Sequence, residues 1–138
     1  MKYLLDTSVV SELISEFPSA SVTRFVDSLD QEDMFLSVIT VGEIAKGIER
    51  LPNSQRKQEL KKWLYEGLLV RFEGNIIPLD AEIFIRWGEL SAKFERIGVV
   101  RSALDSLIAA TVLAHRLVLV TTNESDFEHT GVEIVNPW

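Results

Sequence analysis

The sequence predicts an α/β fold in which a central, mainly parallel sheet is flanked by helices in three layers. Five short apolar runs have the length and composition of buried strands, and longer segments with helical periodicity alternate with them. Such alternation is typical of a parallel sheet covered on both faces. A chain of 138 residues, 46% of them hydrophobic, can fill one core, so we expect a single domain over residues 1–138.

The predicted strands share a short run of aliphatic and β-branched residues that ends at a polar or turn residue. They cover residues 2–5, 34–38, 75–78, 117–121 and 132–135. The strand at 117–121 has the most continuous apolar run. The strand at 75–78 ends at Pro78, because proline cannot donate a hydrogen bond to a neighbouring strand.

The predicted helices share apolar residues at every third or fourth position, and Pro18 and Pro52 mark the first connections between them. They cover residues 8–15, 19–29, 40–50, 54–69, 80–97 and 102–115. The helix at 54–69 is amphipathic, with leucines and Trp63 on one side and lysines on the other.

Acidic residues recur where apolar runs give way to helical patterns. Asp6 follows the first run, Glu43 the second and Asp126 the fourth, and Asp105 opens the apolar segment before that fourth run. The carboxyl ends of strands in an open α/β sheet share one edge, so these residues can converge on one crevice. Carboxylate ligands without Cys or His indicate a site for a hard cation, Mg²⁺ or Mn²⁺.

Helix capping is an alternative explanation for each acidic residue. Thr40 to Glu43 and Ser102 to Asp105 resemble capping boxes, and Asp6 could be an N-cap. The joint pattern favours the metal, because independent caps would be scattered among Ser, Thr, Asn and Asp. Closely placed carboxylates repel, so such a cluster is stable and ionised mainly with a cation among them.

The net charge of −7 argues against a domain that holds nucleic acid by bulk electrostatics. Any such contact must be local. Lys46 and Arg50 lie one and two turns after Glu43, and more basic residues follow at 56–62. Such a basic run is most often a solvated helix face, and its alternative function is to guide phosphates along an edge beside the acidic pocket. The chain lacks cysteine, a signal-peptide pattern and any apolar stretch near the roughly 18 residues of a spanning helix, so we expect a cytoplasmic protein.

Four segments in combination are similar to the successive motifs of PIN-domain ribonucleases, most closely the VapC and FitB-like toxins of toxin–antitoxin modules. The segments are residues 4–12, 37–43, 104–111 and 120–127, and the resemblance extends from residue 2 to about residue 136. It implies a compact PIN-like α/β fold with an active site of converging carboxylates.

The resemblance also implies roles for individual residues. Asp6, Glu43 and Asp105 would coordinate metal, with Asp126 as a more variable fourth ligand. Thr7 would position metal-bound water or phosphate, and Asn123 matches a polar position after the fourth strand. Thr122 stands where related proteins commonly have a basic residue, so one phosphate contact is expected to be missing.

The sequence therefore predicts a Mg²⁺- or Mn²⁺-dependent endoribonuclease toxin that hydrolyses phosphodiester bonds of single-stranded RNA. The expected catalytic carboxylates are those of Asp6, Glu43, Asp105 and Asp126, and the substrate-positioning residues are Thr7, Asn123, Lys46 and Arg50. Expected partners are RNA, a cognate antitoxin and a second copy in a homodimer. Segments 19–29 and 54–69 are candidate antitoxin grooves.

Two other classes of protein remain open from the sequence. A phospho-acceptor receiver domain also places acidic residues at strand ends, but it would need a lysine at the end of its last strand, and none follows Lys93. A non-catalytic module could use the acidic surface only to hold a basic partner.

Overall fold

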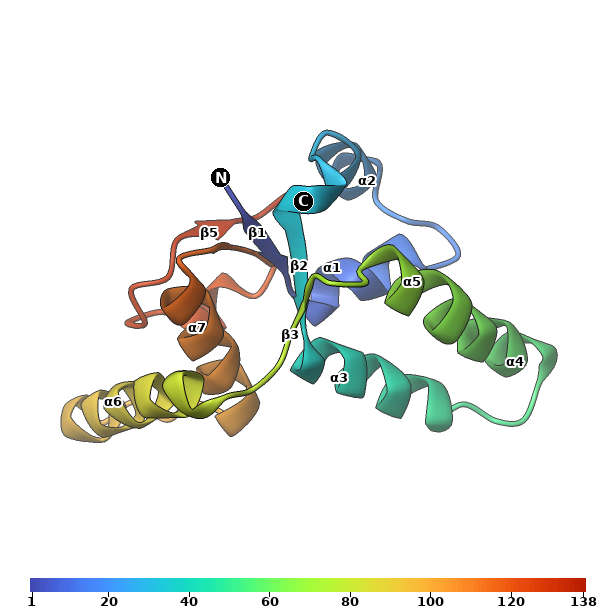
Figure 1. Ribbon diagram of the computed structural model, residues 1–138. Coiled ribbons are helices and arrows are strands. Elements are labelled where there is room, and N and C mark those ends of the chain that lie inside the picture. Colours follow the sequence, from blue (N-terminus) through green and yellow to red (C-terminus); the bar gives the residue numbers. More distant parts are fainter.

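Five parallel strands form the central sheet of the protein in the computed structural model, which describes residues 1–138 (Figure 1). The sheet has the order β3-β2-β1-β4-β5. The strands are β1 (Tyr3–Leu5), β2 (Met34–Ser37), β3 (Ile76–Ile77), β4 (Val118–Val120) and β5 (Ile134–Val135). The predicted fold class and all five predicted strands are confirmed, with ends that are one or two residues shorter.

The strand order decides between the sequence-based alternatives for the fold. Receiver domains have the order 2-1-3-4-5, so the phospho-acceptor alternative is wrong. Here β1 is central, and it pairs with β2 on one side and with β4 on the other, where Leu5 lies opposite Val120. The chain runs outward in both directions from β1 and β4, and ligands in open α/β sheets bind at the carboxyl ends of such strands.

The helices agree with the predicted spans, with one informative difference. They are α1 (Thr7–Leu13), α2 (Ala20–Asp27), α3 (Val38–Glu49), α4 (Gln55–Lys62), the π-helical turn η2 (Trp63–Leu68), α5 (Leu69–Arg71), α6 (Ala81–Ile97) and α7 (Ala103–His115). Helix α3 begins directly after β2, because Ser37 Oγ accepts a hydrogen bond from the Ile39 N–H at 3.0 Å. The capping box expected at Thr40 is therefore wrong, and Glu43 lies in the second turn of α3.

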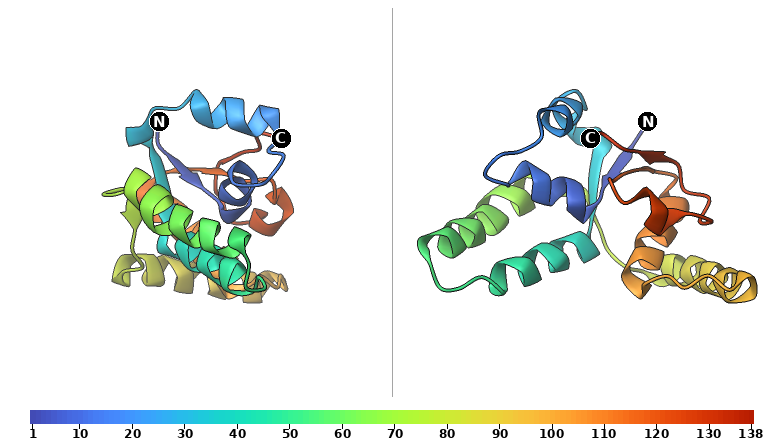
Figure 2. Two further views of the ribbon diagram at one scale, coloured as in Figure 1. Left: turned by 90° about the vertical axis from the view of Figure 1, so that its right-hand side faces the viewer. Right: turned by 180° about the vertical axis from the view of Figure 1, so that it is seen from behind.

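Helices cover both faces of the sheet. Helices α6 and α7 lie on one face, and α1 to α5 lie on the other (Figures 1 and 2). Leu4 belongs to the core beneath α6 and α7, whereas Leu5 belongs to the core beneath α1 to α5. Neighbouring residues of a strand point to opposite faces, so this short central strand contributes to both cores.

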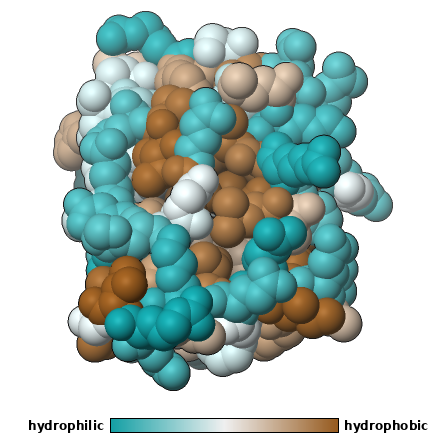
Figure 3. All heavy atoms as spheres, turned by 90° about the vertical axis from the view of Figure 1, so that its left-hand side faces the viewer, coloured by the Kyte–Doolittle hydropathy of each residue, from teal (hydrophilic) through white to brown (hydrophobic).

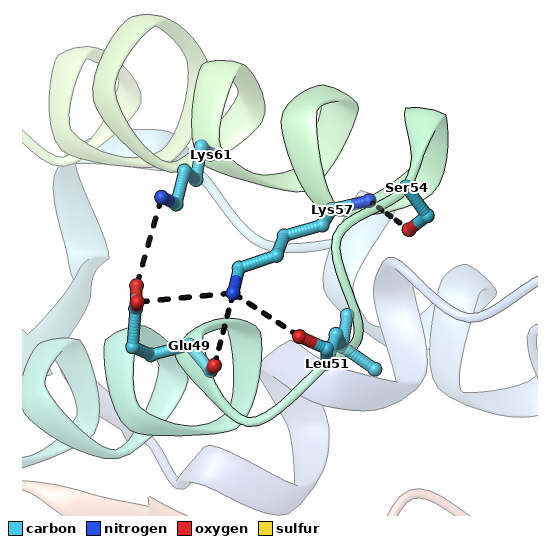
Figure 4. A network of polar contacts seen from close by, with 5 residues as sticks. All are labelled: Glu49, Leu51, Ser54, Lys57 and Lys61. Carbon is cyan, nitrogen blue, oxygen red and sulfur yellow. Dashed lines mark hydrogen bonds and ion pairs between the residues drawn. The ribbon is translucent and has the colours of Figure 1, made fainter.

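A buried lysine fixes the connection between α3 and α4, contrary to the solvated face expected for the basic run. Lys57 is only 6% exposed, and its Nζ donates to the carbonyl oxygens of Glu49 (3.0 Å) and Leu51 (3.1 Å) (Figure 4). Arg56 Nη2 donates to the Ile14 carbonyl oxygen at 3.0 Å. These contacts join α4 to the ends of both α1 and α3.

Large apolar side chains are exposed on α6 and around the start of α7. They are Phe84, Ile85, Ile97, Val100 and Leu104. The face drawn in Figure 3, which is the left-hand side of Figure 1, shows hydrophobic patches among hydrophilic side chains. No helix of the protein has the length and apolar character needed to cross a membrane.

Candidate active site

Asp6 lies at the carboxyl end of β1, where the chain enters α1. Its backbone N–H donates to the Val120 carbonyl oxygen of β4 at 3.0 Å. Asp6 occupies the N-cap position of α1, but its side chain makes no capping hydrogen bond. Instead its Oδ2 accepts a hydrogen bond from Thr121 Oγ1 at 2.7 Å, so the expected capping role of this side chain is wrong.

Two of the other predicted carboxylates act electrostatically on Asp6. Burial raises the pKa of Asp6 above its ordinary value of 3.8, and the hydrogen bond from Thr121 opposes this shift. The negative charges of Glu43 and Asp105 raise the pKa of Asp6 further. Glu43 and Asp105 therefore lie close enough to Asp6 to act on its charge, although they are 37 and 99 positions away in the sequence.

Glu43 is half-buried and is held by a residue from another element. Its Oε1 accepts a hydrogen bond from Thr7 Oγ1 at 2.7 Å, and Thr7 Oγ1 also lies 3.1 Å from Thr40 Oγ1. The hydroxyl of Thr7 thus orients a carboxylate from α3. Its expected contact with water or phosphate stays a prediction.

Asp105 lies in the first turn of α7. Its backbone N–H donates to the Oγ of the N-cap residue Ser102 at 3.1 Å, so one half of the expected capping box is formed. The carboxylate of Asp105 is half-buried and has no hydrogen-bond or ion-pair partner within the protein. Capping therefore engages the backbone of Asp105 and leaves its side chain available.

The other predicted site residues lie outside this cluster. Asp126 is exposed on the 3₁₀ segment η3 (Glu124–Phe127) and is not among the charges that shift the pKa of Asp6. Asn123 directly precedes η3, and its backbone N–H donates to Thr121 Oγ1 at 3.0 Å. Lys46 and Arg50 are exposed on and just after α3, and neither forms an ion pair.

Thr121 is the site residue that sequence reasoning missed. It is fully buried directly after β4, and its hydroxyl contacts Asp6. The signal that could have found it is its position, because a polar residue that ends a buried parallel strand beside β1 must lie next to Asp6.

The carboxylate oxygens of Asp6, Glu43 and Asp105 are of the chemical type that a hard cation binds. No three acidic or histidine side chains are close enough to hold one ion among them as arranged. Mg²⁺ keeps several waters in its shell, so one or two of these carboxylates could bind it directly while the others contact it through water. A cation would also relieve the repulsion that Glu43 and Asp105 exert on Asp6.

The model of the PIN domain matches residues 3–133, which is nearly the whole chain. The chain belongs to the PIN domain family. This membership confirms the resemblance stated from the motifs. Among PIN domain relatives, the chain is 35% identical to "Toxin FitB" of Neisseria gonorrhoeae, over 98% of this chain and 97% of the relative. It is 33% identical to "VapC ribonuclease Y4jK" of Sinorhizobium fredii, over 98% of this chain and 96% of the relative.

Solved structures of PIN domain toxins have the same fold. FitAcB from Neisseria gonorrhoeae superposes with a TM-score of 0.94 at 34% identity, covering 99% of this chain and 98% of that chain. VapBC2 from Rickettsia felis, bound to a DNA fragment from its promoter, superposes with a TM-score of 0.83 at 26% identity. That match covers 100% of this chain and 99% of the other.

Proposed function

We propose that this PIN domain protein is a metal-dependent endoribonuclease and the toxin of a toxin–antitoxin module. Its relatives include proteins named as VapC ribonucleases and as the toxin FitB, matched over nearly their whole length. The observation that supports the proposal is the buried Asp6 directly after β1, on which the charges of Glu43 and Asp105 act, with Glu43 held by Thr7, the neighbour of Asp6. Such an enzyme would meet its RNA in the cytoplasm.

The residues of the cluster divide into metal-holding and supporting groups. Asp6, Glu43 and Asp105 would hold Mg²⁺ or Mn²⁺, with Asp126 as a fourth carboxylate from η3. When bound, the ion would supply Lewis-acid activation of water and of the phosphodiester. Thr7 holds Glu43 in place, and a carboxylate oxygen not occupied by the ion can accept a proton from the attacking water.

A single-stranded RNA suits this site. Its backbone can bend into a crevice that a stiff duplex cannot enter. The protein carries a net charge of −7, so phosphate attraction must come from local cations, and Lys46 and Arg50 are exposed beyond Glu43 on the same helix. Asn123, exposed after β4, would complete the contacts with the substrate.

Apolar hollows beside the cluster support an antitoxin as the partner. One hollow of about 200 Å³ lies between α1 and the α4–α5 segment, and a second of about 150 Å³ lies between α1, α3 and α4. Trp63 lines both hollows, and Glu43 lines the second. An amphipathic segment of an antitoxin seated along 54–69 would therefore reach the active site, whereas segment 19–29 lines neither hollow.

Homodimerisation is part of the same proposal. The exposed apolar side chains of α6 and the start of α7 form a surface suited to a second copy of the chain. Antitoxin on one face and a second copy on the other would give a hetero-oligomer.

RNA cleavage by wild-type protein, Asp6→Asn and Asp27→Asn tests the function. Asp27 is an exposed carboxylate on α2, so Asp27→Asn makes the same chemical change away from the cluster. We expect Mn²⁺-dependent cleavage by wild type and Asp27→Asn, and none by Asp6→Asn or in chelator. Cleavage that persists in chelator contradicts the proposal. RNA binding without any cleavage would favour the non-catalytic acidic module.

A further inference from the structure

We infer that Thr121 is a positioning residue that sets the orientation of the Asp6 carboxylate and thereby the affinity of the site for a divalent cation. The inference rests on the proposed function in one respect, namely that Asp6 is a metal ligand. Thr121 lies within the fourth motif segment, 120–127, but the motif assigned it no role. Its role follows from three hydrogen bonds and its burial.

The backbone holds Thr121 beside Asp6. Val120 pairs with Leu5 in the β1–β4 ladder, so the next residues of the two strands, Thr121 and Asp6, emerge side by side. The Thr121 N–H donates to the Val135 carbonyl oxygen of β5 at 3.1 Å. Thr121 is thus fixed by β5 and aligned with β1, and its side chain is fully buried.

The hydrogen-bond pattern determines the direction in which the Thr121 hydroxyl donates. Its Oγ1 accepts the backbone N–H of Asn123 at 3.0 Å, and a hydroxyl has only one hydrogen to donate. The shortest contact to an acceptor is 2.7 Å, to Asp6 Oδ2, whereas Ser8 Oγ lies 3.5 Å away. The hydrogen therefore points to Asp6 Oδ2.

This donation leaves the two oxygens of Asp6 with different roles. Oδ2 is engaged by Thr121 and, more weakly, by Ser8 Oγ at 3.4 Å. Oδ1 accepts no hydrogen bond from a side chain, and the further hydrogen bond that favours the charged carboxylate comes from the Thr7 backbone, so we infer that Oδ1 is the oxygen that would face an ion. Fixing one oxygen also fixes the plane of the carboxylate, and outer hydrogen bonds of this kind orient metal ligands.

Thr111 offers a matched control. It is also a fully buried threonine, but its hydroxyl donates to the Leu107 carbonyl oxygen within α7 at 2.8 Å. Thr111→Val therefore removes a buried threonine hydroxyl without touching Asp6. Thr121→Ser keeps the donor, and Thr121→Val keeps the shape of the side chain while removing the donor.

Isothermal titration of Mn²⁺ into the full-length protein without RNA tests the inference. We expect Thr121→Val to weaken Mn²⁺ binding by about 10- to 100-fold, the usual effect of losing an outer hydrogen bond to a metal ligand. Thr121→Ser and Thr111→Val should bind like wild type. In cleavage assays, the Mn²⁺ concentration for half-maximal rate should rise for Thr121→Val, while the KM for RNA stays near that of wild type.

Wild-type Mn²⁺ affinity in Thr121→Val, or an equal loss in Thr121→Ser, would overturn the inference. If the valine variant does not fold, Thr121→Ala removes the same donor and is judged by the same comparison. A wild type that binds Mn²⁺ but leaves RNA intact would refute the proposed function alone, because the titration still decides the role of Thr121. A wild type that binds no Mn²⁺ would overturn both.

Discussion

Burial of the ionised Asp6 carboxylate should lower the free energy of unfolding of the metal-free protein. Burial raises the pKa of Asp6 above 3.8, so the folded state keeps this proton to higher pH than the unfolded state. The stability contributed by this group is complete below about pH 3.8 and is lost as the pH rises through the folded pKa. At neutral pH in chelator, the charged carboxylate of Asp6 therefore destabilises the fold.

Asp6→Asn removes this charge and is expected to be more stable than wild type at neutral pH in chelator. The advantage should shrink as the pH falls through the raised pKa of folded Asp6 and vanish below about pH 3.8, where the aspartate is protonated in both states. Urea unfolding across this pH range measures it, with Asp27→Asn as the control. A variant that is less stable than wild type at neutral pH would contradict the burial argument.

Replacing Lys46 and Arg50 tests whether these side chains guide RNA to the active site or are only solvated on the surface of α3. If both contact phosphates, replacing both with Ala should lower the slope of log affinity against log salt by about 1.4, since each contact on a single strand contributes about 0.7. Turnover at saturating RNA should change less. RNA binding over a salt series is the measurement, and Arg86→Ala with Arg96→Ala on the exposed face of α6 is the charge-matched control. An unchanged slope would remove the guiding role and leave the metal site untouched.

At the level of elements, Lys57 ties the α3–α4 hairpin together. Lys57→Met keeps most of the apolar stem but leaves two carbonyl oxygens without their donor, so we expect a loss of about 1–3 kcal/mol in the free energy of unfolding. Lys62→Met is the control, because Lys62 is exposed, and surface changes usually stay within about 0.5 kcal/mol. Equal stability of the two variants in urea unfolding would show that the hairpin does not depend on Lys57.

The elements were largely predictable because apolar runs and caps are local signals. The start of α3 was not, since Ser37 both ends β2 and caps the helix. The burial of Lys57 was also missed, because it depends on carbonyl oxygens at positions 49 and 51 that a helical pattern does not reveal. The position of Asp6 at the end of β1 followed from the apolar run that precedes it, whereas the joint metal site of Asp6, Glu43 and Asp105 stays a prediction. Thr121 stayed hidden because its partner Asp6 lies 115 positions away.

For the whole molecule, the net charge of −7 and the apolar hollows favour a basic, amphipathic antitoxin. Co-expression with the neighbouring gene of its operon should yield a complex, and the measured mass of this complex should correspond to two copies of this chain together with the antitoxin.

Trp63→Ala should weaken the complex, because Trp63 lines both hollows. Phe17→Ala is the control, since Phe17 is exposed and lines neither. A monomeric chain that retains no partner would contradict both the dimer and the antitoxin groove.

The central claim is that carboxylates at the end of β1 and in α3 and α7 hold a divalent cation at one edge of the sheet. Anomalous diffraction from crystals soaked in Mn²⁺ locates this ion directly. We expect an anomalous peak beside Asp6, between Glu43 and Asp105, in wild type, and no peak there in Asp6→Asn. A peak elsewhere on the protein, or an unchanged peak in Asp6→Asn, would contradict the account.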